Sequence, residues 1–516
     1  GWKATLLGSV AAVSLTSAVM AAQVTLQTTD GSLSITGELL EFDGTIYRMQ
    51  TLIGTLEIDS ATVVCSGDAC PDIERTTQFA IAVGDGVDNT LLANLIEEYA
   101  FQEELVAEQT ISEGQTALEL MREGEDVLVS VQVERSDTPE AFSKLLGGEA
   151  AVALTTRPVG ATEIDAFAQA GFANPSLPEQ EKVIALDALV PVTAPGNRMR
   201  TVTLQQLALM AAGTITNWSQ LGLDPAPLRV VLPAEGTASF EVLRALVLDP
   251  SRVTVAPSIE RVAGDEDLSD TVARDPNAIG VVSLSSQRNA QIVPVRRICG
   301  AIARPSSFTI KAEEYPLTRR VFMYLTGQPV PSRITDLVSF AGSTAARDAI
   351  QSVGFIDQSI VSTDFDEQGV RLASALLSAP DNPTLRALQN FSREFIDAER
   401  LSTTFRFTTG SSNLDNKALG DIDRMAEYLT RGEAADLDIL VVGFTDSFGR
   451  QDLNVLLGQS RAEQVEQALI RAAGGGIAPN RITAQSFGPL APVGCNETAA
   501  GRAINRRVEI WLRNRG

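Results

Sequence analysis

The sequence predicts a multidomain α/β protein with a small N-terminal β module, a two-lobed α/β domain and a C-terminal α+β sandwich of βαβαβ type. The chain has 516 residues, more than one hydrophobic core usually serves. Buried-strand patterns alternate with helical patterns through the middle of the chain, and a strand–helix–strand series returns near its end. We place the segments at 1–22 (signal peptide), 24–72, 76–360, 361–400 (helical linker) and 401–516.

The first segment, 1–22, has the features of a secretory signal peptide. Lys3 supplies a positive charge, an Ala/Leu/Val-rich run follows, and Val19-Met20-Ala21 fits a cleavage site of small residues. An uncleaved membrane anchor is the alternative, but Gly8 and Ser9 interrupt the apolar run. We therefore expect export to the periplasm, an oxidising compartment in which disulfides form.

The second segment, 24–72, alternates apolar and polar residues and is rich in β-branched side chains. This pattern predicts a small antiparallel β module. Asp30-Gly31 and Asp43-Gly44 are expected to form the turns between its strands.

The chain has four cysteines, and export favours their pairing. Cys65 and Cys70 flank a turn-forming segment, so we predict a disulfide between them, with two free thiols as the alternative. Cys299 and Cys495 lie in different predicted domains, and a bridge between them is compatible with the sequence without being specified by it.

The composition argues against several classes of function. The chain contains no histidine, which excludes a Ser-His-Asp triad, a Cys-His dyad and His-ligated zinc or haem. We also find no cluster of carboxylates suited to a metal and no activated nucleophile, so we expect neither an enzyme nor a cofactor. The net charge of −24 repels nucleic acid, and we expect no nucleic-acid partner.

The third segment, 76–360, alternates apolar strand patterns with helical ones. Such alternation predicts a mainly parallel sheet, and this length suits two lobes around a cleft. Several strands lead into a helix start or a hydroxyl-rich turn, where backbone N–H groups suit an anion. The candidate anion contacts are Thr155, Thr156, Arg157, Thr237 and Ser239.

The last segment, 401–516, places an acidic and a basic residue on neighbouring elements. Asp446 follows a buried strand and should lie at the edge of the sheet, while Asn454, Leu457 and Arg461 share one face of the next helix. A carboxylate and a guanidinium so placed could hold the ammonium and the carboxylate of a zwitterion. The alternatives are that Asp446 and Arg461 pair with each other, or that Asp446 caps a turn.

The same segment resembles the C-terminal domain of the outer-membrane protein A (OmpA) family. Three stretches carry the resemblance: Gly443-Phe-Thr-Asp-Ser-Phe-Gly449, then Asn454 to Ala462, then Gly501 to Glu509. It implies non-covalent binding of peptidoglycan, with Asp446 and Arg461 holding the diaminopimelate of the stem peptide. Asn454, Leu457 and Arg506 are implied as flanking contacts. Phe444 departs from the family, which often has His or Tyr there.

The resemblance also implies a location in the periplasm, associated with peptidoglycan and the outer membrane.

The third segment resembles the substrate-binding protein of phosphate ABC transporters. The resemblance is carried by Thr155-Thr156-Arg157-Pro158, 185–190, 204–218, 275–280 and 315–319. It implies a two-lobed periplasmic binding protein of type II that binds phosphate or another small anion.

Two loops of this segment differ from that family. The loop that bears a hydroxyl in the family is here Gly84–Asp88, with two carboxylates and no hydroxyl, and the family's Ser-Gly-Thr is Glu235-Gly236-Thr237. A carboxylate facing phosphate would weaken binding. The alternative is therefore a structural linker that has lost ligand binding and contacts an envelope protein.

Overall fold

The computed structural model of the protein describes most of the chain. The described residues are 23–28, 32–42, 46–67, 69–71, 76–87, 89–112, 115–124, 126–377, 379–407 and 413–515. They belong to two compact units, Gly1–Thr76 and Thr77–Gly516. The predicted signal peptide and both predicted Asp-Gly turns lie outside the described residues. Among the described helices, none has the length and apolar character to cross a membrane.

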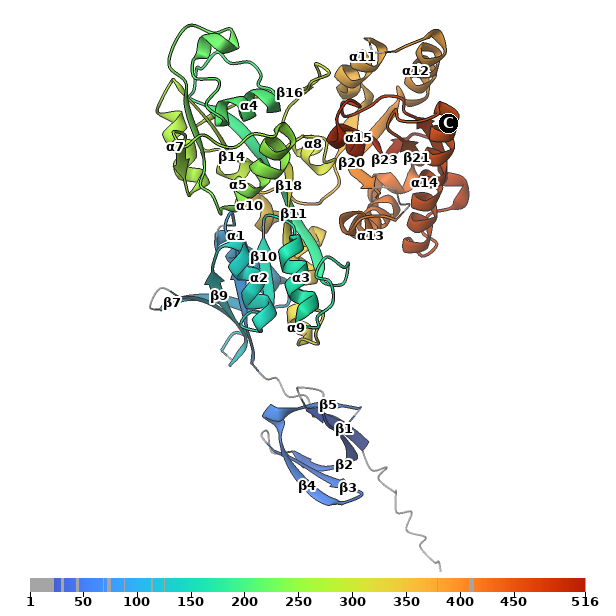
Figure 1. Cartoon of the computed structure of the whole chain (residues 1–516). Coiled ribbons are helices and arrows are strands. Elements are labelled where there is room, and N and C mark those ends of the chain that lie inside the picture. Colours follow the sequence, from blue (N-terminus) through green and yellow to red (C-terminus); the bar gives the residue numbers. More distant parts are fainter. Residues whose placement is uncertain are drawn as a thin grey trace, which may run out of the picture. The chain divides into compact units, whose positions relative to one another are not determined.

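The first unit contains one five-stranded antiparallel sheet, as predicted (Figure 1). Its strand order is β4-β3-β2-β1-β5, with β1 (Gln23–Thr28), β2 (Ser34–Phe42), β3 (Ile46–Thr51), β4 (Gly54–Asp59) and β5 (Val63–Ser66). A small core forms where the alternating side chains of these strands meet, around Val24, Leu26, Tyr47, Met49 and Val63. The predicted Cys65–Cys70 disulfide closes the loop after β5.

The central domain has two lobes joined by one long strand, β11 (Glu181–Thr193). Residues 181–188 of β11 pair with β18 (Thr318–Tyr324) in the first lobe, and 189–193 pair with β14 (Ala278–Ser283) in the second. The first lobe also contains β6 (Thr77–Val83), β7 (Val106–Ser112), β8 (Gln115–Met121), β9 (Val127–Arg135) and β10 (Val152–Thr155). The second lobe adds β12 (Arg229–Pro233), β13 (Glu260–Val262) and β15 (Gln291–Ile292).

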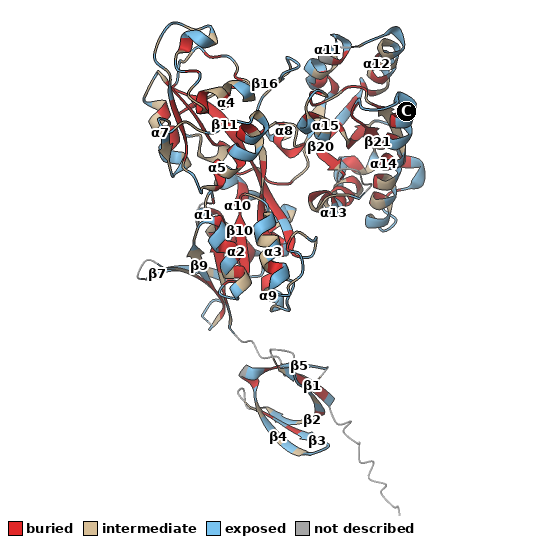
Figure 2. Ribbon diagram, in the orientation of Figure 1, coloured by how far each residue is buried: buried red, intermediate tan, exposed pale blue. Residues whose placement is uncertain are grey.

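The sheet is mixed, so the prediction of a mainly parallel sheet holds only for the centre of each lobe. β6 runs parallel to β9 and β10, and β12 runs parallel to β13 and β14. β11 and β18 run antiparallel to each other and to their neighbours β14 and β10. Because β11 is shared by both lobes, it is paired along its length with strands of each, and all its residues except Lys182 are buried (Figure 2).

Helices cover both faces of the first lobe's sheet. α1 (Asn89–Gln102), α9 (Ser332–Ala341) and α10 (Arg347–Ser352) contribute to one core, and α2 (Thr138–Gly147) and α3 (Ala161–Gln169) to the other. The second lobe carries α4 (Leu204–Ala211), α5 (Ala238–Leu243), α6 (Asp249–Ser251) and α7 (Asp265–Ala273). Short elements, α8 (Ser307–Lys311), β16 (Val295–Arg296) and β17 (Ile302–Ala303), lead towards the C-terminal domain.

The C-terminal domain is a five-stranded sheet between two layers of helices. Its order is β19-β20-β23-β21-β22, with β19 (Ser362–Asp364), β20 (Ala398–Arg406), β21 (Asp438–Phe444), β22 (Ile482–Gly488) and β23 (Arg507–Arg513). α13 (Asn416–Thr430) and α14 (Gln451–Ala472) pack on one face, and α11 (Gly369–Leu377) and α12 (Asn382–Phe395) on the other. α15 (Ala499–Asn505) precedes the last strand.

The segment 361–400, which the sequence suggested as a linker, packs as part of this domain. Its strand β19 pairs with β20, and its helix α12 buries an aromatic cluster against the sheet. Phe391 lies 6.1 Å from Phe444, and Phe395 lies 4.9 Å from Trp511, between ring centroids. Pro383 lies in the first turn of α12, where its missing N–H costs little, so the helix continues through it.

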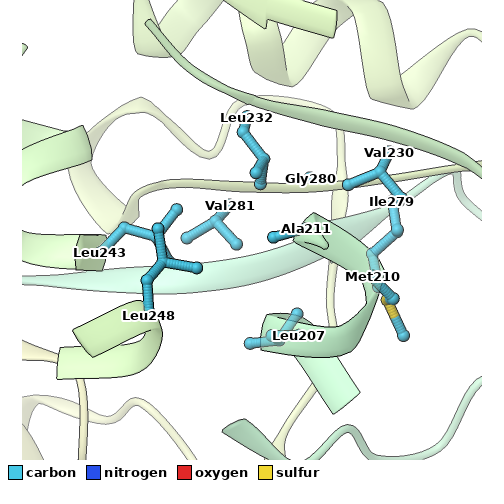
Figure 3. A pocket seen from close by; sticks show the side chains of 10 residues that line it. All are labelled: Leu207, Met210, Ala211, Val230, Leu232, Leu243, Leu248, Ile279, Gly280 and Val281. Carbon is cyan, nitrogen blue, oxygen red and sulfur yellow. The ribbon is translucent and has the colours of Figure 1, made fainter. Parts of the chain in front are cut away.

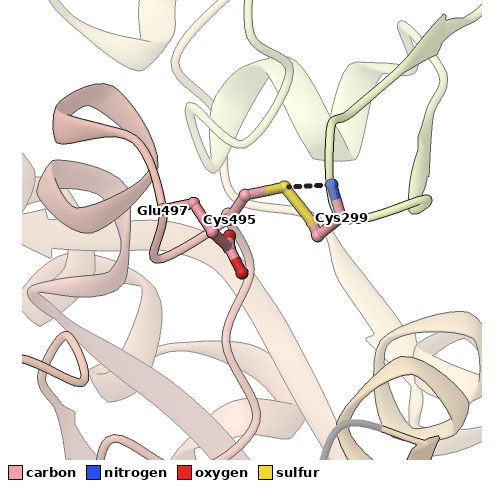
Figure 4. Close-up of side chains that lie close together, drawn as sticks. All are labelled: Cys299, Cys495 and Glu497. Atoms are coloured by element: carbon pink, nitrogen blue, oxygen red, sulfur yellow. Dashed lines mark hydrogen bonds between the residues drawn. A yellow bond between two sulfur atoms is a disulfide. The ribbon is translucent and has the colours of Figure 1, made fainter.

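Ion pairs and a disulfide connect the central and C-terminal domains. Arg320 of β18 bonds Glu313 at 2.6 Å and Asp415, which precedes α13, at 2.8 Å. Arg400 of β20 pairs with Glu314. Cys299 and Cys495 form a disulfide that the sequence left undecided (Figure 4).

We expect the ion pair of Glu313 with Arg320 to persist in mild acid and to be lost only as the pH approaches 2. Burial by itself would raise the pKa of the Glu313 carboxyl, but the Arg320 guanidinium outweighs burial, and the pKa is lowered to about 2. The pair therefore stabilises fully above about pH 4.5, and up to about 3 kcal/mol is lost as the pH falls towards 2. Thermal unfolding followed from pH 7 to pH 2 measures this loss. Glu313→Gln should be less stable at pH 7 and should show a shallower decline; an equally steep decline would contradict the assignment.

Candidate functional site

A cavity of about 320 Å³ opens beside the carboxyl end of β21 in the C-terminal domain. It is lined by Thr445, Asp446, Phe448, Asn454, Leu457, Arg461, Arg502 and Arg506. All five residues that the sequence predicts for this site line the cavity. Since they come from β21, α14 and the segment after α15, the cavity depends on how closely these elements pack.

Two glycines allow α14 to lie directly on β21. A Cβ atom on Gly443 would lie 2.0 Å from the backbone oxygen of Gly458, and one on Gly458 would lie 2.3 Å from Oγ of Ser486. No larger residue fits at this contact without moving the helix. Gly458 precedes Arg461 by three positions, so the close contact also brings Arg461 over the end of the strand.

Asp446 is nearly buried and its carboxylate is held on both sides. Oδ1 accepts a hydrogen bond from the backbone N–H of Phe448 at 2.9 Å, and Oδ2 pairs with Arg506 at 2.9 Å. Asn454 donates its side-chain amide to the backbone oxygens of Asp446 and Phe448, at 3.3 and 3.0 Å. Asn454 therefore stabilises the conformation of the loop that carries Asp446.

Besides Thr445, whose Oγ1 has no partner among the described residues, Arg461 is a side chain of the cavity with unused hydrogen-bonding capacity. It is 4% exposed, and its Nε and Nη1 atoms have no hydrogen-bond partner in the part of the chain that the structure describes. Its guanidinium lies 5.1 Å from the ring centroid of Phe407. Burial lowers the pKa of Arg461, Arg506 lowers it further and Asp446 raises it. Buried donors without partners are costly, and a bound carboxylate would satisfy them.

The sequence interpretation missed Arg502 as a lining residue. Arg502 donates to the backbone oxygen of Asn496 at 2.8 Å, and Asn496 also accepts from the N–H of Ser447. Arg502 lies on α15, four residues before Arg506, and this spacing could have indicated that both side chains face the cavity. Three guanidinium groups and one carboxylate now line the cavity, which is locally positive in a chain of net charge −24.

The candidate anion residues of the central domain lie near the junction of the lobes, but each already has partners. Thr155 donates to the backbone oxygen of Arg157 at 2.9 Å, and Thr156 to that of Asp85 at 3.3 Å. Thr237 caps α5 by accepting from the N–H of Phe240. Arg157 pairs with Glu163 at 2.6 Å, so its charge is neutralised within the first lobe.

Ser239 belongs to a buried network of charges. It donates to Asp265 at 2.6 Å and accepts from Arg319 at 3.1 Å. Arg319 also bonds Asp187 at 2.8 Å. Burial raises the pKa of Asp265, and Arg319 opposes that effect. The single guanidinium of this network is therefore shared by two carboxylates.

A second cavity, in the second lobe, is a gap in packing with an apolar lining (Figure 3). Its volume is about 10 Å³, close to the smallest space that holds one water molecule. The lining residues include Leu207, Met210, Leu243 and Ile279, which offer no side-chain hydrogen bonds. It has neither the size nor the chemistry of a ligand site.

Comparison with known families agrees with the two resemblances. Residues 110–341 match the model of the PBP superfamily domain, and residues 406–506 match that of the OmpA family. The chain carries a PBP superfamily domain and an OmpA family domain. These are families of binding and structural proteins.

Several curated relatives match one domain or the other. Outer membrane porin F of Pseudomonas fluorescens is 38% identical over 110 residues, 21% of this chain and 32% of that protein. The peptidoglycan-associated lipoprotein of Legionella pneumophila is 33% identical over 106 residues, 20% of this chain and 57% of that protein. The phosphate-binding protein PstS of Borreliella burgdorferi is 22% identical over 182 residues, 34% of this chain and 65% of that protein.

The chain spans between 32% and 53% of the length of the first curated relatives it matches. Among solved structures, an ABC-type phosphate transport receptor from Vibrio cholerae is 20% identical with a TM-score of 0.41. The match covers 54% of this chain and 99% of the Vibrio cholerae chain.

The contact of Gly443 with Gly458 in the OmpA family domain can be tested by adding one methyl group. Gly443→Ala should destabilise the domain by about 1–3 kcal/mol, because the backbone of α14 has to move away from β21. Chemical denaturation followed by tryptophan fluorescence measures the change, since Trp511 is buried on β23 of the same sheet.

Gly420→Ala is the matched control. A Cβ there would lie 3.4 Å from the flexible end of Arg424, an ordinary contact, so it should leave stability equal or slightly higher. Equal effects of the two substitutions would show that the close contact of helix and strand is not required.

Proposed function

We propose that the protein belongs to the bacterial cell envelope and binds peptidoglycan non-covalently through its OmpA family domain. In this proposal Arg461 donates to a carboxylate, and Asp446 accepts from the ammonium, of diaminopimelate in the stem peptide. The observation that carries the proposal is that Nε and Nη1 of Arg461 have no partner among the described residues and lie in a cavity that also contains Asp446. The name of the Legionella pneumophila relative supports peptidoglycan as the ligand.

The rest of the cavity supports the same assignment. Arg506 already pairs with Asp446, so an ammonium would share that carboxylate with Arg506. Phe448 and Leu457 present apolar surface, 81% and 43% exposed, at the edge of the cavity. One such site per chain can hold a polymer with many stem peptides, because several chains bind the same sheet of wall. A periplasmic location associated with the outer membrane belongs to this proposal.

Sedimentation with purified peptidoglycan sacculi tests the proposal on the full chain. Asp446→Ala and Arg461→Ala should each weaken retention roughly 10- to 100-fold, since each removes a charge-assisted hydrogen bond. Arg461→Lys should bind sacculi more tightly than Arg461→Ala but less tightly than the unmodified chain, because an ammonium cannot bind a carboxylate in bidentate geometry.

Arg450→Ala is the matched control for these variants. Arg450 directly precedes α14, is 73% exposed at its side chain and pairs with Asp452 outside the cavity. Its substitution should leave retention unchanged. Retention of the double variant Asp446→Ala/Arg461→Ala at the level of the unmodified chain would refute the proposal.

Two functions are candidates for the PBP superfamily domain. The phosphate-binding relative from Borreliella burgdorferi supports a site for phosphate or another small anion. The guanidinium of Arg319 is bonded to Asp187 and close to Asp265, which argues against a bound anion. The second candidate is therefore a structural connector that contacts an envelope protein. Asp187 and Asp265 together carry more negative charge than Arg319 compensates, so this network would repel a second anion.

Calorimetric titration of the full chain with phosphate separates the two. Heat of binding together with a higher melting temperature supports anion binding. Neither response, together with recovery of one specific envelope protein by the immobilised chain, supports the connector.

A further inference from the structure

One carboxylate joins the two lobes of the central domain. Asp85 follows β6 in the first lobe, and its Oδ1 accepts from the backbone N–H and the hydroxyl of Thr138 of that lobe, at 2.9 and 2.7 Å. Its Oδ2 accepts from the backbone N–H of Ala238, in the second lobe. One side chain thus receives three hydrogen bonds, and the donors lie on both sides of the junction between the lobes.

The loop that carries Asp85 is bonded to Thr156 of the first lobe and to Ala238 of the second. Thr156 donates its hydroxyl to the backbone oxygen of Asp85 at 3.3 Å. Gly86 has a positive φ of 79°, and a Cβ there would lie 2.7 Å from the Thr156 hydroxyl and 3.5 Å from the Cβ of Ala238. Only glycine fits both this conformation and this space. The short distance from this added Cβ to Ala238 agrees with the hydrogen bond in placing the Asp85 loop next to the second lobe.

The charges beside this contact favour an internal carboxylate over a second anion. Ser239, next to Ala238, bonds both Asp265 and Arg319, and Arg319 bonds Asp187. Arg319 is thus shared by Asp187 and Asp265, and Asp85 bonds Ala238, the residue next to Ser239. A phosphate ion entering here would meet like charge, and it would compete with Asp85 for the same N–H and hydroxyl donors.

We propose that Asp85 is the built-in ligand of the central domain: its carboxylate occupies the donors at the lobe junction and holds the two lobes closed without a bound solute. A two-lobed binding protein ordinarily closes around a solute that both lobes contact. Here the chain supplies that contact itself. The inference goes beyond the envelope function proposed above and does not depend on binding to peptidoglycan.

Asp85→Asn in the full chain is the sharpest test. An amide has one acceptor oxygen, and its NH₂ group would face either Thr138 or Ala238, both of which present N–H donors. The variant should melt about 4–8 °C lower than the unmodified chain, and small-angle X-ray scattering should give a larger radius of gyration as the lobes open. Asp165→Asn, at an exposed position of α3, is the matched control and should change neither quantity.

Titration with inorganic phosphate provides a second measurement, on Asp85→Ser. This variant removes the charge and leaves the donors of Thr138 and Ala238 free, so it should bind phosphate at least about tenfold more tightly than the unmodified chain. Phosphate should also reduce its radius of gyration. Far-ultraviolet circular dichroism identifies any variant that fails to fold, and Asp85→Asn, which matches Asp85 in size, then carries the test alone.

Two results would overturn the inference. The first is Asp85→Asn with the melting temperature and radius of gyration of Asp165→Asn, because the lobes would then close without the Asp85 carboxylate. The second is an unmodified chain that binds phosphate as tightly as Asp85→Ser, because Asp85 would then not occupy the donors. Sacculus binding enters neither measurement, so failure here is distinct from failure of the peptidoglycan proposal.

Discussion

The buried carboxylate of Glu509 holds together the part of the protein on which the peptidoglycan-binding proposal depends. Glu509 lies in β23, is fully buried, and pairs with Arg507 at 2.6 Å, Arg371 at 3.0 Å and Arg400 at 3.2 Å. Burial alone would raise its pKa, but the three guanidinium groups reverse that effect and lower the pKa far below its usual range. A charge buried at this depth is tolerated only because its partners are fixed around it.

These partners come from separate elements, so Glu509 also determines how the elements assemble. Arg371 belongs to α11, Arg400 to β20, and Arg400 reaches Glu314 of the central domain. The same buried cluster therefore ties the helices before the sheet, the sheet itself and the preceding domain to one another. Together with the Cys299–Cys495 disulfide, it makes the OmpA family domain and the PBP superfamily domain parts of one compact unit.

The two candidate sites use similar chemistry in opposite ways. At the cavity of the C-terminal domain, Arg461 is buried with donors that have no partner among the described residues, and this arrangement calls for a ligand. At the lobe junction of the central domain, the donors of Thr138 and Ala238 are occupied by Asp85, and Nε of Arg319 is bonded to Asp187. The difference lies in whether the chain itself provides the acceptor. When a side chain of the protein itself accepts the hydrogen bonds of the site, it can hold the lobes closed, and those donors are no longer free for a solute.

The sequence by itself determined the order of domains and most of the residues around the cavity of the C-terminal domain. These features follow from local periodicity and from a motif whose spacing places Asn454, Leu457 and Arg461 on one helix face. It also identified Asp85 as a carboxylate where the related family has a hydroxyl. Only the tertiary structure decided that Asp446 pairs with Arg506, that 361–400 packs into the C-terminal sheet, and that Asp85 reaches Ala238. Each of these contacts joins residues at least 35 positions apart, and the packing that brings such distant residues together leaves no periodicity in the local sequence.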